Sequence, residues 1–507
     1  MKSVRSGYVA SCLLAVGCSA EPSLTIYNQN FAVVRDVAPL ELKAGVNEVR
    51  FAETTAHLEP ESVMLLDPSG KLELQVIEQN YRNDPVSQEL LLSLFEGKTI
   101  GFVVKEPMKP DRTVQGKIIR SGYAPHSQQA MQRYGSRYSQ SQMMYAYGGG
   151  SANQPIVEAE GVIRFGLPGQ PVFPSLGDDA ILKPMLTWKL QAAKDAKLEA
   201  QLTYMTGGMS WSADYNAVSE ENGDTLDLIG WVTMDNQSGK TFENAKVKLM
   251  AGDVSKLNPG SRFDLDRAQM AYDSCAVGVR SGPGVVERRF DEYHLYSLER
   301  PCTLRDRETK QVEFIRATGV SCKKVYVYDG LNVDWQRWRG YGMENLRRNE
   351  EFGSASDTKV AVLREFQNTK ANGLGMPLPK GQVRFYVKDG RQLEFTGENV
   401  IDHTPKDERV RIFTGNAFDL VGERRRTQFK VDSSGKWTDE SFEIKVRNHK
   451  KEAVEIRVVE HLYRWLTWDI TNFSAPFNKS DAQEIVFPVA LKPDEEKTVT
   501  YTVHYSW

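Results

Sequence analysis

The sequence predicts a mainly β protein of multiple β-sandwich (immunoglobulin-like) domains, with few short helices and long irregular loops. Apolar and polar residues alternate over short segments such as 46–51 and 383–387, which is typical of strands with one face on a core. Asp329-Gly330 and Asp389-Gly390 follow such segments, and both residue types suit tight turns. The length of 507 residues, with 40% hydrophobic and 26% charged residues, gives room for about three globular domains.

Strands are expected in order along the chain, with one helix near its start. Asp84-Pro85 opens a helix that runs to Glu96, because Pro suits a first helical turn and Gly97 suits the stop. The expected strands are 24–27, 31–37, 46–51, 72–76, 98–105, 161–165, 189–205, 224–235, 245–250, 324–328, 383–387, 392–395, 441–447, 454–463 and 497–505.

These elements suggest a division into six parts. Residues 123–155 are rich in Ser, Gln, Tyr, Met and Gly without any period, so they cannot bury enough apolar area to offset their ordering entropy. Residues 255–300 and 331–358 are expected to be long loops with short helices. The parts are a signal peptide (1–17), a small β domain (23–122), a low-complexity linker (123–155), a β-sandwich (156–330), an irregular region (331–374) and a C-terminal β-sandwich (375–507).

The first residues resemble a lipoprotein signal. Lys2 and Arg5 precede an apolar stretch over 8–16, and Ala15-Val16-Gly17-Cys18 follows, which predicts lipidation at Cys18. Ordinary secretion with cleavage after Ala20 is the alternative. No later segment approaches 18 uncharged apolar residues, so we expect an extracytoplasmic chain that meets a membrane through its lipid anchor only.

The cysteines leave two alternatives open. In an oxidising compartment Cys302 and Cys322 flank what look like neighbouring strands, and a bridge between them would close a short loop. Unpaired buried thiols, Cys275 included, fit the spacing equally well.

Charge and histidine spacing point away from several classes of function. The 64 basic and 67 acidic side chains give a net charge of −3, so no nucleic-acid partner is expected. The seven histidines show no HxH, HxxxH or HExxH spacing, so neither a metal nor any other cofactor is predicted.

Catalytic candidates are weak. Ser210 lies in Gly208-Met209-Ser210-Trp211-Ser212, which resembles a nucleophile elbow but lacks its closing Gly and its strand–turn–helix context. His403 follows Asp402, yet adjacent residues of a strand point to opposite faces. A hydrolase whose site is assembled from such distant residues is therefore the alternative interpretation rather than the leading one.

One segment interleaves aromatic and basic residues. The candidate binding loop consists of Trp335, Arg337, Trp338, Arg339 and Tyr341. Flat rings beside guanidinium groups suit stacking on sugars or contact with a partner protein. The alternative is that the two tryptophans, three residues apart, form a buried edge of a short helix. The run Arg424-Arg425-Arg426 has no aromatic partner and is read as a solvated face.

Several longer motifs resemble a bacterial family, the domain of unknown function 4139, which also occurs in mucoidy-inhibitor-like proteins. The matching segments are 206–215 (TGGMSWSADY), 230–241, 251–254 (AGDV), 304–314 (LRDRETKQVEF), 326–328 (YVY), 401–405 (IDHTP) and 415–424 (GNAFDLVGER). The resemblance covers roughly residues 156–507 and implies a β-rich extracytoplasmic domain without an established activity. The chain lacks the long coiled-coil insert of mucoidy-inhibitor-like members.

Taken together, the sequence predicts a cell-envelope lipoprotein that is not an enzyme and that binds an envelope protein or glycan as a binding or scaffold protein.

Overall fold

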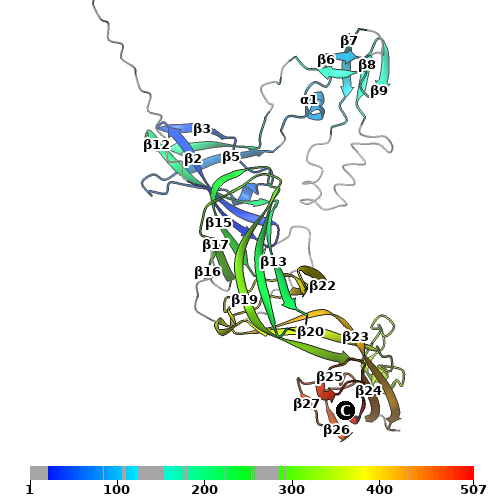
Figure 1. The fold of residues 1–507 in the computed structure, drawn as a ribbon. Coiled ribbons are helices and arrows are strands. Elements are labelled where there is room, and N and C mark those ends of the chain that lie inside the picture. The colour runs from blue at the N-terminus through cyan, green and yellow to red at the C-terminus, as the bar shows by residue number, and fades with distance from the viewer. Residues whose placement is uncertain are drawn as a thin grey trace, which may run out of the picture. The chain divides into compact units, whose positions relative to one another are not determined.

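The computed structural model describes residues 21–83, 85–105, 110–123, 154–174, 176, 181–221, 223–252, 254, 256, 285–290, 293–432, 434 and 436–507 (Figure 1). This part of the chain is mainly β, with several separate sheets and few short helices, so the predicted fold class is confirmed. The chain divides into two compact units, one of residues 1–211, 234–277 and 289–310 and the other of residues 212–233, 278–288 and 311–507.

The first unit is built around a sheet in the order β16-β17-β15-β1-β2-β12-β4, with β18 paired to β15. Strand β1 pairs antiparallel with β2 and parallel with β15. In β1 the three central residues, Leu24, Thr25 and Ile26, are all buried. The elements are β1 (Ser23–Tyr27), β2 (Phe31–Leu42), η1 (Pro60–Ser62), β4 (Met64–Leu66), β12 (Ala196–Gly207), β15 (Phe242–Ala251), β16 (Val285–Phe290), β17 (Tyr293–Leu298) and β18 (Cys302–Leu304).

Two smaller sheets complete the first unit. One has the order β10-β6-β7-β8-β9 and the other the order β3-β11-β5. In Figure 1 helix α1 lies beside the sheet that contains β6 to β9. Leu92 of this helix is buried in a core with Ile100 and Phe102. The elements are β3 (Gly45–Phe51), β5 (Gln75–Arg82), α1 (Gln88–Leu94), β6 (Thr99–Val104), β7 (Arg112–Arg120), β8 (Ile156–Ala159), β9 (Val162–Phe165), β10 (Gln170–Val172) and β11 (Met185–Ala192).

The second unit contains most of a large sheet in the order β22-β21-β13-β14-β19-β20-β23-β24-β29-β26, to which β25, β27 and β28 attach through β19. Its elements are β13 (Met209–Glu220), β14 (Thr225–Asn236), β19 (Glu308–Asp329), α3 (Met343–Arg348), β20 (Lys359–Gln367), η2 (Lys370–Asn372), β21 (Gly381–Asp389), β22 (Gln392–Ile401), β23 (Arg409–Val431), β24 (Trp437–Asn448), β25 (Val454–His461), β26 (Trp468–Phe473), β27 (Asn478–Lys479), β28 (Glu484–Leu491) and β29 (Glu496–Ser506). Strands β13, β14, β16 and β19 each contain residues of both units.

Several local predictions are confirmed. Helix α1 lies within the predicted 84–96, and the Ser87 side chain accepts a hydrogen bond from the backbone N–H of Leu90, which caps the helix. Asp389 pairs with Gln392 across the predicted β21–β22 hairpin, and Gly390 has φ +59°. The left-handed conformation explains why glycine occupies that turn.

Other features differ from the sequence-based expectation. Residues 285–290 and 293–298, expected in an irregular loop, form β16 and β17, because β17 pairs with β15 and is stabilised by its ladder. Strand pairing also crosses the boundary drawn at residue 122, since β2 pairs with β12 along residues 31–42 and 196–207. Such long-range pairing leaves no mark on local periodicity.

The described part of the chain contains no helix long and apolar enough to cross a membrane.

The packing of Gly422 in β23 yields a first prediction. A Cβ there would lie 2.1 Å from Cε2 of Tyr328, whose ring is fully buried. We expect Gly422→Ala to lower the free energy of unfolding by about 1–3 kcal/mol, because the ring must move in a packed core. Gly342→Ala is the control, since a Cβ at Gly342 would meet nothing within 4 Å. Equal denaturant midpoints for the two variants would contradict the packing of Tyr328.

Candidate binding surface on the 331–358 loop

The segment between β19 and β20 folds around a small core of its own. Trp338, Leu346 and Phe352 are buried together, and Val333 and Tyr463 pack against them. Helix α3 supplies Leu346. The segment that looks irregular in sequence is therefore an ordered loop with an apolar centre, called below the 331–358 loop.

Two aromatic residues lie on the exposed side of this core. Trp335 is 65% exposed and Tyr341 is 51% exposed. Each still has one edge against the core: the Trp335 ring lies 6.1 Å from that of Phe352, and the Tyr341 ring lies 5.2 Å from that of Trp338. Rings supported in this way keep their orientation and lose little entropy on binding.

A buried ion pair lies beneath the loop. Arg424 of β23 and Glu460 of β25 are both almost inaccessible to solvent, and the Arg424 Nε lies 2.9 Å from the Glu460 Oε1. The Tyr501 hydroxyl donates to the Glu460 Oε2 at 2.5 Å. The Arg424 Nη1 donates to the carbonyl of Gly353 at 3.0 Å, so this pair also holds the loop.

A second buried carboxylate, Glu440 of β24, binds two arginines. The Arg426 Nη1 and the Arg464 Nη2 donate to its Oε1 at 3.0 and 2.8 Å. Glu440 and Arg464 are 0% and 1% exposed. A carboxylate in such a place is tolerated only when it is paired and hydrogen-bonded.

Other guanidinium hydrogens of Arg426 and Arg464 bind backbone carbonyls of the loop. Arg464 donates to the carbonyls of Leu346 and Asn349 through Nη1, at 2.8 and 3.0 Å, and to that of Phe352 through Nη2, at 2.8 Å. Arg426 donates to the carbonyl of Glu350. Carbonyls from 346 to 353 are thus held by side chains of β23 and of the segment between β25 and β26, which fixes the loop backbone.

Stacking adds to this attachment. The Arg347 guanidinium of α3 lies 3.2 Å from the centre of the Trp465 ring and 5.2 Å from that of Trp507. Arg347 is 9% exposed, and a cation over an aromatic face is stabilised most where water is excluded.

The electrostatics keep the two buried arginines charged and the Tyr501 hydroxyl protonated. Burial acts to lower the pKa of Arg424, but the Glu460 carboxylate, together with Tyr501 and Tyr463, outweighs it and the pKa is raised. Arg464 behaves in the same way beside Glu440. Burial, followed by the charge of Glu460, raises the pKa of the Tyr501 hydroxyl, which therefore remains a donor. Arg424, Arg426, Arg464, Glu440 and Glu460 are called the clamp below. Their arrangement suits holding the loop in place rather than transferring protons.

The structure divides the predicted binding loop into two groups. Trp338 is only 7% exposed and belongs to the core, which agrees with the alternative interpretation for this ring alone, because Trp335 is exposed and neither lies in a helix. Arg337 lies over the Trp338 ring and pairs with Glu351. Trp335, Arg339 and Tyr341 are exposed and define, with exposed Met343, the surface that we call the aromatic surface.

The interpretation of 424–426 as a solvated face is wrong for two of its three residues. Arg424 is 3% exposed and the Arg426 side chain is 10% exposed, whereas the Arg425 side chain is 68% exposed. Side chains alternate across a strand, so Arg424 and Arg426 share the inner face with Leu420 and Gly422. This alternation was the signal available in the sequence, but the run of three arginines was interpreted as one exposed face.

The catalytic candidates lie in different units. Ser210 lies in β13 and is half-buried, with strands rather than a helix on both sides of the turn at Gly208. Asp402 and His403 are exposed in the turn after β22, where the Lys380 Nζ lies 3.2 Å from the Asp402 Oδ1 and the Lys380 N–H donates to the His403 Nδ1 at 3.1 Å. The structure assigns Ser210 to the first unit and the other two to the second.

The Cys302–Cys322 bridge is contradicted, since both residues are free cysteines. Cys302 lies in β18 and pairs with Ala245, whereas Cys322 lies in β19 and pairs with Phe366. The two strands thus have different partners, which the sequence spacing did not show. Cys12, Cys18 and Cys275 lie outside the described residues.

Within the described ranges, no three His, Cys, Asp or Glu side chains are arranged to hold a metal ion.

Comparisons with protein-family models, with curated proteins and with solved structures found no match for this chain. The resemblance to the domain of unknown function 4139 therefore stays a prediction.

The buried pair gives a second prediction. We expect Arg424→Met to cost about 3–5 kcal/mol of unfolding free energy, because it leaves the Glu460 carboxylate buried without its cation. Arg424→Met combined with Glu460→Gln should cost clearly less than the single change, because no unpaired charge remains. Equilibrium denaturation measures both, and limited proteolysis at 331–348 should rise with the single variant. A single variant that loses less than about 1 kcal/mol would contradict the clamp.

The thiols give a third prediction. Burial raises the pKa of Cys302, and it raises the pKa of Cys322 to about 11, so at pH 8 only about one Cys322 in a thousand is a thiolate. We expect slow alkylation of Cys322 in the folded protein and complete alkylation of Cys302 and Cys322 in guanidinium without a reductant. Peptide mass spectrometry measures alkylation in the folded and in the unfolded protein. A Cys302–Cys322 cross-linked peptide would contradict the assignment of both residues as free cysteines.

Proposed function

We propose that this chain is a cell-envelope lipoprotein that works as a binding or scaffold protein, and that its aromatic surface contacts a protein partner. The observation that carries the proposal is the way the 331–358 loop is held. Buried arginines donate hydrogen bonds to its backbone carbonyls, while Trp335 and Tyr341 are exposed. Lipidation at Cys18 would attach the chain to a membrane on the extracytoplasmic side.

The composition of the aromatic surface supports a protein partner. Trp, Tyr, Met and Arg are the residue types enriched in protein–protein interfaces, and Trp, Tyr and Arg dominate their binding energy. An exposed tryptophan supported from behind offers a large apolar area without a rearrangement of the loop. Buried clusters of carboxylates and arginines add little to stability by themselves. Their presence beneath the 331–358 loop therefore favours a function that depends on the position of the loop.

Trp335→Ala is the direct test. We expect it to reduce recovery of the partner from envelope extracts by at least about tenfold, because an interface tryptophan contributes about 2 kcal/mol or more, with a thermal midpoint close to that of the unchanged protein. Cross-linking followed by quantitative mass spectrometry measures the recovery.

Two matched controls sharpen this test. Trp338→Ala should lower the thermal midpoint, since Trp338 lies in the core. Trp468→Ala removes another, half-buried tryptophan of the same unit and should leave partner recovery unchanged. Recovery that is equal for Trp335→Ala and the unchanged protein would reject the aromatic surface, and binding to purified glycans in place of any protein would reject the protein partner.

The predicted lipid anchor has its own test. The intact mass and the N-terminal peptide of the mature protein from membranes should show an acylated Cys18. A free N-terminus at Glu21 would instead mean a released protein, and an unprocessed Met1 would overturn the extracytoplasmic assignment.

A further inference from the structure

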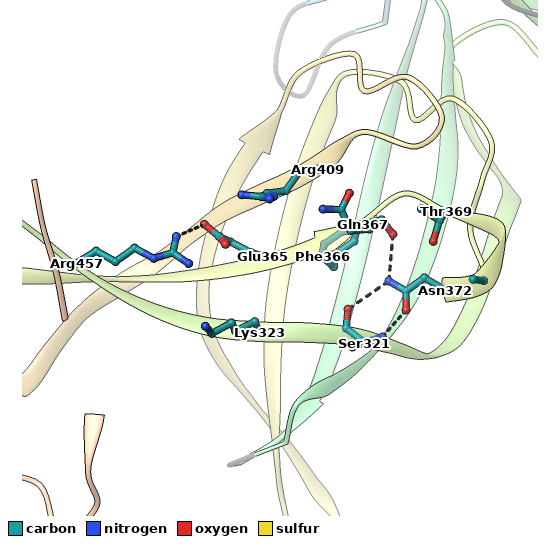
Figure 2. Close-up of a pocket in the computed structure, with 10 residues that line it drawn as sticks. Ser321, Lys323, Glu365, Phe366, Gln367, Thr369, Asn372, Arg409 and Arg457 are labelled. Carbon is teal, nitrogen blue, oxygen red and sulfur yellow. Dashed lines mark hydrogen bonds and ion pairs between the residues drawn. The ribbon is translucent and has the colours of Figure 1, made fainter. Parts of the chain in front are cut away.

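The second unit has a polar pocket that the proposed function does not use. It has a volume of about 490 Å³ and lies between β19, β20, the turn at η2, the start of β23 and β25 (Figure 2). Its charged and amide side chains are Lys323, Glu365, Gln367, Asn372, Arg409 and Arg457.

The strand registers explain why these side chains meet. Lys323 of β19 pairs with Glu365 of β20, and two residues further along β20 Gln367 pairs with Arg409 of β23. Residues two apart in a strand share a face, so cations from both neighbouring strands flank the side chains of Glu365 and Gln367.

Glu365 is the only carboxylate among the described residues that line the pocket, and it is already neutralised. Oε1 of Glu365 accepts a hydrogen bond from Nη1 of Arg457 at 3.0 Å and forms an ion pair with Nε of Arg411 at 2.8 Å, and the Glu365 side chain is 8% exposed. Figure 2 shows Arg457 turned toward Glu365. Glu365 therefore orients arginines at the pocket rather than cancelling the remaining cations.

Lys323 and Arg409 have no such neutralisation. In the part of the chain that the structure describes, neither forms an ion pair with a carboxylate, and both are exposed at the pocket. Asn372 is different, since its amide binds the backbone of Ser321 and Gln367 and fixes the floor where β19 and β20 separate. The pocket thus offers two unpaired cations, with the Gln367 amide and the Thr369 hydroxyl beside them.

We propose that this pocket binds an acidic saccharide, with Lys323 and Arg409 on its carboxylate or phosphate and with Gln367 and Thr369 on its hydroxyl groups. Hydrogen bonds from cations to an oxyanion are the strongest polar contacts available here. The volume exceeds what a bare anion needs and lies in the range of small-ligand pockets. Amide and hydroxyl groups that both donate and accept match a ring bearing hydroxyls. This site is separate from the aromatic surface and does not depend on it.

The test uses the full mature chain on an array of saccharides. The array carries uronate-, sialate- and phosphate-bearing saccharides beside their uncharged counterparts, and titration calorimetry follows with the best member. We expect retention of acidic members only, and the comparison of carboxylate-bearing with phosphate-bearing members tells which anion the pocket prefers. Affinity should fall as salt rises, because exposed charges are screened.

The variant Lys323→Gln with Arg409→Gln should weaken binding of that saccharide by at least about tenfold, since it removes two charge-assisted contacts. The control Lys430→Gln with Arg391→Gln changes the net charge equally at two other exposed positions of the same unit and should change affinity by less than about twofold. Both double variants should keep the thermal midpoint.

Four results would overturn the proposal. Uncharged and acidic saccharides could bind equally, or none could bind. The control variant could weaken binding as much as the pocket variant, which would mean attraction to the whole surface. Inorganic phosphate alone could bind as tightly as the best saccharide, so that the sugar would contribute nothing.

Discussion

The C-terminal half of the second unit depends on two buried carboxylates and the arginines around them. Glu440 and Glu460 are completely buried, and removing such charges from water costs several kcal/mol each unless cations and hydrogen bonds compensate. Arg424, Arg426 and Arg464 provide that compensation and still have hydrogen atoms left for backbone carbonyls. A planar guanidinium with five donors can serve a carboxylate and a carbonyl at once, which lysine cannot.

This arrangement connects the sheet to the 331–358 loop. The loop has an apolar core of only three buried residues, too little to fix a segment of this length by itself. Hydrogen bonds from the clamp to carbonyls at 346, 349, 352 and 353 supply the missing constraint. Since those donors lie on β23 and on the segment between β25 and β26, order in the loop should be lost when the clamp is lost, while the first unit need not respond.

The sequence predicted the elements of the fold far better than their partners. Alternation identified most strands, and Asp389-Gly390 identified a hairpin, because both signals are local. The pairing of β1 with β15 joins residues more than 200 positions apart, and no local pattern encodes it. Residues 285–290 and 293–298 carry too few regular apolar positions to be recognised as strands; they are strands because β17 pairs with β15 and β16 with β17.

The candidate sites were predicted less well, for a related reason. The aromatic residues of the 331–358 loop were visible in sequence, but which ring is core and which is exposed depends on Phe352 and Tyr463. The clamp needed strand parity together with distant partners, since Arg424 finds Glu460 across 36 positions. The polar pocket could not be predicted without the register of three strands. In the sequence Lys323 and Arg409 are ordinary surface cations. Only their pairing with β20, which lies between them, shows that they share a ligand-sized space and that Glu365 does not pair with them.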